Sequence, residues 1–159
     1  MRNLRGAIGV LVTMSVAAAS AGGCGNDGKD VVVHNQGDLC VYPTSEPNAV
    51  PFGADTTARD YAAGEVANLM VFFGCLSGSC TSDRQGSCTA TQNGDVISVD
   101  ATATYHDTGA HECTADCAYL LARCTTEPLA AGTFTFSFTG AETQLAVPST
   151  VAPPCIRQP

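Results

Sequence analysis

Apolar and polar residues alternate along the stretches on both sides of Asn93-Gly94. A period of two is typical of strands with one buried face, and Asn-Gly is the preferred pair for a two-residue type I′ turn. Such a turn pairs Ala90 with Ile97 across the hairpin. The turn and the alternation agree on one apolar face, which comprises Cys88, Ala90, Ile97, Val99, Ala101, Ala103 and Tyr105.

A second alternating stretch, residues 133–138, places Phe134, Phe136 and Phe138 on one face. Gly140-Ala141 follows and predicts a type II′ turn, which takes Gly at its first central position. This turn sets Phe136 opposite Leu145. We expect the phenylalanines to lie in the core, where each buried ring contributes roughly 1.5–3 kcal/mol, and not to line a ligand surface.

The nearly continuous apolar run 69–73 predicts a strand over 65–73 that is buried on both faces. A helix over 55–73 is the competing interpretation, and Gly64 in its middle counts against it. Shorter strands are expected at 31–34 and 39–42, followed by a long surface loop over 43–60.

Short strands, close turns and alternating faces predict an all-β fold, a disulfide-stapled antiparallel β-sandwich. Thr and Val are frequent, which favours strands, and no long amphipathic helix is visible. The stretch 129–149 resembles the closing hairpin of an immunoglobulin-like domain. The chain has no Trp, so the Cys…Trp…Cys signature of antibody domains is absent.

The N-terminal segment has the parts of an export signal: Arg2 and Arg5, an apolar run over 7–19, and small residues up to Gly23. Together with Cys24 it resembles a bacterial lipoprotein signal, although Ala21 stands where Leu is usual. The resemblance implies a signal peptide over 1–23, a lipidated cysteine with a tether over 24–36, and a single disulfide-rich domain over 37–159.

A lipidated Cys24 implies that the partner of the N-terminus is a lipid bilayer, held by several acyl chains at about 0.8 kcal/mol per buried methylene. Gly25 follows the cysteine where Asp would favour the inner membrane. The resemblance therefore implies an outer-membrane lipoprotein, with its domain in the periplasm or at the cell surface. The alternative is ordinary cleavage after an A-x-A pattern in 17–21 and secretion.

The chain has nine cysteines, and removing Cys24 leaves an even number. In an exported domain these are expected to form disulfides. We expect Cys40 to pair with Cys155, which leaves the two remaining groups of three to exchange one bond with each other. The candidates are Cys40, Cys75, Cys80, Cys88, Cys113, Cys117, Cys124 and Cys155.

Charge argues against a nucleic-acid partner. Five of the seven basic residues follow residue 23, against all fifteen acidic ones, which gives a net charge of −10. Phosphate binding needs clustered Lys and Arg. The acidic residues are scattered, so we interpret them as a solubilising surface.

Zinc-ligand residue types gather around one short loop, at His106, Asp107, His111 and Glu112, just before two of the cysteines. Their spacing matches no known zinc motif, and H-E-x-x-H is absent. We therefore expect disulfides in this region, with no metal and no cofactor. G-x-S-x-G, C-x-x-C and phosphate-binding glycine loops are also absent.

The sequence favours a non-enzymatic, membrane-anchored envelope lipoprotein with a structural, adhesive or binding role towards a protein or glycan partner. The loops 75–87 and 106–117 are the best candidates for contacts, because they are polar, rich in glycine and held by cysteines. One alternative is an exported metal-dependent hydrolase that uses His106 and His111. The other is a disulfide-rich module that resembles a protease inhibitor.

Overall fold

The computed structural model describes residues 28–49, 55–110 and 112–158. This part of the chain contains strands and no helix. The strands are β1 (Lys29–His34), β2 (Asp38–Pro43), β3 (Arg59–Tyr61), β4 (Ala67–Leu76), β5 (Thr81–Asn93), β6 (Val96–Asp107), β7 (Ala118–Thr125), β8 (Gly132–Phe138), β9 (Ala141–Val147), β10 (Ser149–Val151) and β11 (Cys155–Ile156). Within these residues, no helix is available that is long and apolar enough to cross a membrane.

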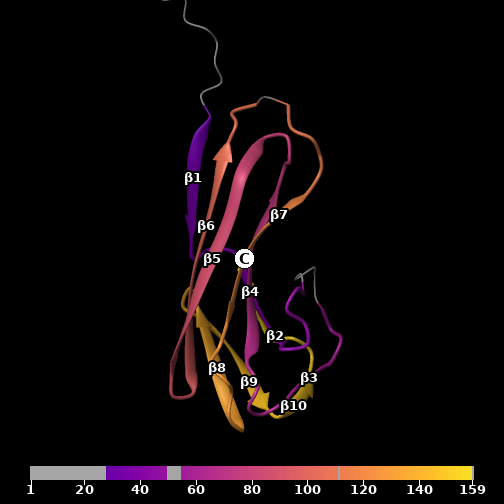
Figure 1. The fold of residues 1–159 in the computed structure, drawn as a ribbon, viewed down its shortest axis with the longest axis vertical. Coiled ribbons are helices and arrows are strands. Elements are labelled where there is room, and N and C mark those ends of the chain that lie inside the picture. The colour runs from indigo at the N-terminus through magenta and orange to yellow at the C-terminus, as the bar shows by residue number, and fades with distance from the viewer. Residues whose placement is uncertain (1–27, 50–54, 111, 159) are drawn as a thin grey trace, which may run out of the picture.

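Two sheets pack face to face in an elongated molecule (Figure 1). In the first, β5 pairs with β6 along nearly all of its length, so β1 and β8 share the other edge of β6 and β9 follows β8. The second has the order β11-β2-β4-β7, and β3 and β10 form a small extra ladder. The predicted disulfide-stapled β-sandwich is confirmed. One pairing, β6 with β8, is parallel, whereas an antiparallel sandwich was predicted.

The core lies between the two sheets and contains the predicted phenylalanines. Phe136 is fully buried, and Phe134 and Phe138 are buried beside it. They share one cluster with Leu69 and Val71 of the opposite sheet. Met70, between these two, faces the outer side of the sheet and is buried there as well, so the prediction of burial on both faces is confirmed for 69–71. Phe72 and Phe73 are half-buried, and the strand covers 67–76 where 65–73 was expected.

The first predicted hairpin forms, but its register was wrong by two residues. Ala90 pairs with Val99 and not with Ile97, and the turn residues are Gly94 and Asp95. Gly94 has a φ of 62° at the first central position, and Asp95 has no positive φ, which is the type II′ arrangement. A shift of two residues keeps every side chain on its predicted face.

The second hairpin shows the same kind of difference. Phe136 pairs with Thr143, and Leu145 lies opposite Phe134. The turn residues are Thr139 and Gly140, with φ of 56° and 82°, so the turn is type I′ and not the predicted type II′. Gln158, near the C-terminal end of the chain, contacts this turn, and its Nε2 donates to Thr139 Oγ1 at 2.5 Å.

Some boundaries also differ from the expected ones. Strand β1 lies within 24–36, the range expected as a tether, and pairs with β6 from Asp107 to Thr102. The expected loop over 43–60 ends in β3, which pairs with β10. Strands β3 and β4 occupy the segment for which a helix was the alternative, so that alternative is wrong.

Candidate functional site

Two loops lie together at one end of the sandwich, the upper end in Figure 1. One connects β4 to β5 through residues 77–80, and the other leaves β6 at Thr108 and reaches β7 after Cys117. Disulfide Cys80–Cys113 joins the two loops, and Cys75–Cys117 joins the end of β4 to the second loop, with Cα–Cα distances of 5.4 and 4.9 Å. We call the described residues of these two loops, 77–80, 108–110 and 112–117, the stapled end.

The disulfides pair all eight candidate cysteines. Cys40 is joined to Cys155, the pair expected from their positions, and links neighbouring strands β2 and β11. The two groups of three exchange three bonds, where one was expected. The third of these bonds, Cys88–Cys124, connects β5 of one sheet to β7 of the other at a Cα–Cα distance of 5.5 Å.

A glycine allows the two sheets to approach closely beside this last bond. A Cβ at Gly86 would lie 2.0 Å from the carbonyl oxygen of Leu121, far inside van der Waals contact. The missing side chain therefore lets the backbones of β5 and β7 touch two residues away from Cys88. The sheets are thus joined both covalently and by direct backbone packing at this edge.

A network of hydroxyl groups and one carboxylate organises the stapled end. Ser79 Oγ accepts from the Thr114 amide at 2.9 Å and lies 3.0 Å from Thr114 Oγ1. The Asp116 carboxylate accepts from the Gly78 amide at 3.0 Å and from the Thr114 hydroxyl. The Thr114 hydrogen bond, with that of Gly78, lowers the pKa of Asp116 below its ordinary value.

This arrangement can fix the shape of the loops, and its chemistry is that of a polar surface. Within the described residues, none of the hydrogen bonds of this network involves a His or Lys that would act as a base towards a serine. His106 bonds elsewhere, with Nδ1 2.8 Å from Asp30 Oδ1. The serines and threonine are therefore held as hydrogen-bonding groups.

The residues of zinc-ligand type around this loop do not form a cluster in the part of the chain that the structure describes. His106 contacts Asp30, and Asp107 Oδ1 accepts from the Gly109 amide at 3.0 Å. The neighbouring cysteines are in disulfides, which removes their thiolates as ligands. No group of three His, Cys, Asp or Glu side chains in this part of the chain is placed to hold a metal. His111 lies outside the described residues, as does Cys24.

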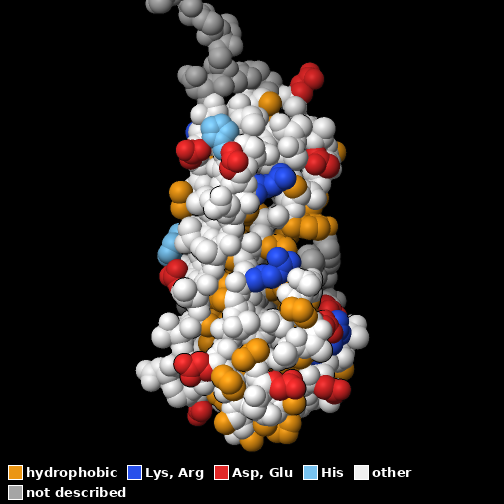
Figure 2. Space-filling view, in the orientation of Figure 1, with side chains coloured by type: hydrophobic (Ala, Val, Ile, Leu, Met, Phe, Trp, Pro, Cys, Tyr) orange, Lys and Arg blue, Asp and Glu red, His pale blue; other side chains and the backbone are white. Residues whose placement is uncertain are grey.

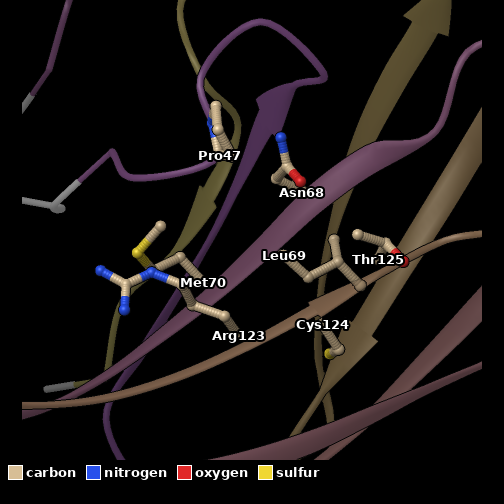
Figure 3. A pocket seen from close by; sticks show the side chains of 7 residues that line it. All are labelled: Pro47, Asn68, Leu69, Met70, Arg123, Cys124 and Thr125. Atoms are coloured by element: carbon tan, nitrogen blue, oxygen red, sulfur yellow. The ribbon is translucent and has the colours of Figure 1, made fainter.

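A small pocket on the outer face of the second sheet was not expected from the sequence (Figure 3). It has a volume of about 100 Å³ and is lined by Pro47, Asn68, Leu69, Met70, Arg123, Cys124 and Thr125. Arg123 and Met70 are cross-strand partners on β7 and β4, and their side chains lie together at its side. The only sign of this pocket in the sequence is Arg123, which lies between apolar residues of β7. The alternation of apolar and polar residues assigns such an arginine to a solvated face and does not indicate a pocket.

The visible surface carries no single concentrated charge patch. Figure 2 shows acidic side chains spread from one end of the molecule to the other, with the few basic ones between them. This distribution fits the interpretation of the acidic residues as a solubilising surface.

Comparison with family models, with curated proteins and with solved structures found no match. The resemblance of 129–149 to an immunoglobulin-like hairpin therefore stays a prediction, as does the lipoprotein signal.

Proposed function

We propose that this protein is a non-enzymatic lipoprotein of the cell envelope, anchored in a bilayer through an acylated Cys24. The observation that supports it best is the cysteine pairing. All eight cysteines after Cys24 are bonded to one another within the sandwich. Cys24 is the remaining cysteine of the nine, in a position that suits lipidation.

The outer membrane is the proposed location, with the domain in the periplasm or at the cell surface. Four disulfides suit either place, because both are oxidising compartments. The domain's role there is structural, adhesive or binding. Loops held by two disulfides lose little conformational entropy when they meet a partner, which favours the stapled end as a contact surface.

Intact mass of the mature protein, extracted from membranes with detergent, tests the anchor. We expect an N-terminus at Cys24 with the added mass of acyl chains, and no free thiol after denaturation. The variant Cys24→Ala should appear in the soluble fraction, whereas Ser20→Ala, a matched change within the same segment, should stay with the membrane. An unacylated product that begins before residue 24 and carries a free Cys24 would contradict the proposal.

A further inference from the structure

We infer that the stapled end faces the lipid bilayer, so that its two loops lie at the headgroups and the rest of the sandwich projects away from the membrane. The inference rests on the proposed acylation of Cys24 and adds the orientation of the domain. It follows from where the first strand begins, from the length of chain before it, and from the chemistry of the two loops.

Strand β1 begins at the stapled end. Its first residue, Lys29, pairs with Asp107, the last residue of β6. The next residue, Thr108, already belongs to the stapled end, where its amide donates to the Cys80 carbonyl at 2.9 Å. The chain therefore enters the sandwich beside the two disulfides, and Figure 1 shows β1 starting at the same end as these loops.

The chain between the anchor and β1 is short. Four residues separate Cys24 from Lys29, so the two Cα atoms are five steps apart and lie at most about 18 Å from each other when the chain is fully extended, at roughly 3.3–3.6 Å per step. Strand β6 has 12 residues and runs about 40 Å from Asp107 to Val96, at about 3.3 Å per residue. The stapled end is thus tied close to the bilayer, while the turn at Gly94 lies a strand length further away.

The loops suit contact with headgroups and not insertion among acyl chains. Their described residues are Ser, Gly, Thr, Ala, Glu, Asp and disulfide-bonded Cys, with no large apolar side chain. Hydroxyl and amide groups hydrogen-bond to headgroups as they do to water. The two disulfides keep this polar surface in one shape.

The long sides of the molecule are poorly suited to lie flat on lipid. The exposed large apolar side chains, Val32, Val96, Tyr119 and Val151, belong to four different strands and do not follow one flank. The acidic side chains are spread along the visible face (Figure 2), so a flat orientation would bring several of them to the bilayer. An upright domain limits this contact to the stapled end, whose described carboxylates are Glu112 and Asp116, and its Gly94 turn then points away from the membrane.

The chain has no Trp, so one introduced Trp reports its own distance from the bilayer. Ala115→Trp places it at the stapled end, and Ala130→Trp, at another exposed alanine two residues before β8, is the matched control. Each full-length acylated variant is reconstituted into phosphatidylcholine vesicles with and without lipid that carries a headgroup nitroxide. Intact mass first establishes that acyl chains are present and that all thiols are bonded.

We expect the nitroxide to quench Ala115→Trp several-fold more strongly than Ala130→Trp. Adding Cys24→Ala should abolish quenching in both. Equal quenching of the two, or stronger quenching of Ala130→Trp, in acylated protein overturns the orientation and leaves the anchor intact. Quenching of Ala115→Trp that persists with Cys24→Ala overturns the role of the anchor in orientation. Absence of acyl chains overturns the proposed function, and the orientation with it.

Discussion

At the stapled end, two disulfides hold loops of small and polar residues, whereas the hairpin of β8 and β9 buries three phenylalanines and contains no cysteine. Phe136 lies against β6 near Ile97, at the opposite end of that strand from Asp107. We call this hairpin and its contacts the phenylalanine end. The two ends of one sandwich are therefore held by different forces.

The difference follows from what each segment can bury. An aromatic ring withdrawn from water contributes roughly 1.5–3 kcal/mol, so the phenylalanine end is stabilised in its folded state. Small polar residues offer no such gain. A disulfide instead lowers the conformational entropy of the unfolded chain, so it can stabilise a loop that buries almost no apolar side chains.

The largest effect is expected at the phenylalanine end. Phe136→Ala removes a fully buried ring, and we expect it to lower the free energy of unfolding by about 3–5 kcal/mol, because a cavity remains in the core. Urea denaturation measures the loss. Gln144→Ala, an exposed position on the same hairpin, is the control and should change stability by less than about 0.5 kcal/mol. A similar loss in both variants would contradict burial as the stabilising force.

The next largest effect is expected for the bond between the sheets. Replacing Cys88 and Cys124 together by Ala removes a bond between residues 36 positions apart in the chain. The two neighbouring disulfides shorten the loop that this bond closes. We expect a loss of about 3 kcal/mol from the greater freedom of the unfolded chain. The midpoint of urea unfolding measures it. An unchanged midpoint would show that backbone packing at Gly86 alone joins the sheets.

A smaller effect is expected when Cys80 and Cys113 are replaced together by Ala. Cys75–Cys117 already closes nearly the same loop, since Cys80 lies five positions from Cys75 and Cys113 lies four positions from Cys117. We expect a loss of about 2–3 kcal/mol, because the remaining loop is short. Hydrogen exchange should also become faster at the Thr108 amide, which donates to Cys80, with little change at Ile97. Equal acceleration at both amides would contradict a locally stabilised end.

The smallest effect concerns a polar group close to the phenylalanine end. Tyr61 is buried in the same core cluster, and its hydroxyl donates to the Val41 carbonyl at 2.8 Å. We expect Tyr61→Phe to lower the free energy of unfolding by about 1–2 kcal/mol, because a buried acceptor loses its partner. Tyr119→Phe, a change at a half-exposed tyrosine on β7, is the control and should have less effect.

Tyr61 also gives this region a dependence on alkaline pH. Burial raises the pKa of its hydroxyl above the ordinary value of 10.0. Its neutral form is thus favoured in the folded protein, so its stabilisation is full below pH 10.0 and is lost as the pH rises above that value. Urea midpoints between about pH 8 and about pH 11 should fall less steeply in Tyr61→Phe than in the unchanged protein. Identical slopes would contradict this role.

The sequence by itself was sufficient for the faces of the strands. Alternation with a period of two assigned Phe134, Phe136 and Phe138 to the core, and the structure buries all three. The same assignment survived errors of two residues in both hairpin registers, because a shift of two returns each side chain to the same face. The alternation within a strand indicates which of its side chains are buried, so this face can be predicted before the neighbouring strand is known.

Register, turn type and three of the four disulfide pairings were decided by the tertiary structure. Asn93-Gly94 and Gly140-Ala141 each allow more than one turn, and contacts such as that of Gln158 with Thr139 come from segments distant in the chain. The bond between Cys88 and Cys124 likewise requires β5 and β7 to lie together across two sheets. The position of β1 beside the stapled end has the same origin. Local preferences fix which way a side chain points, whereas only packing fixes which strand it meets.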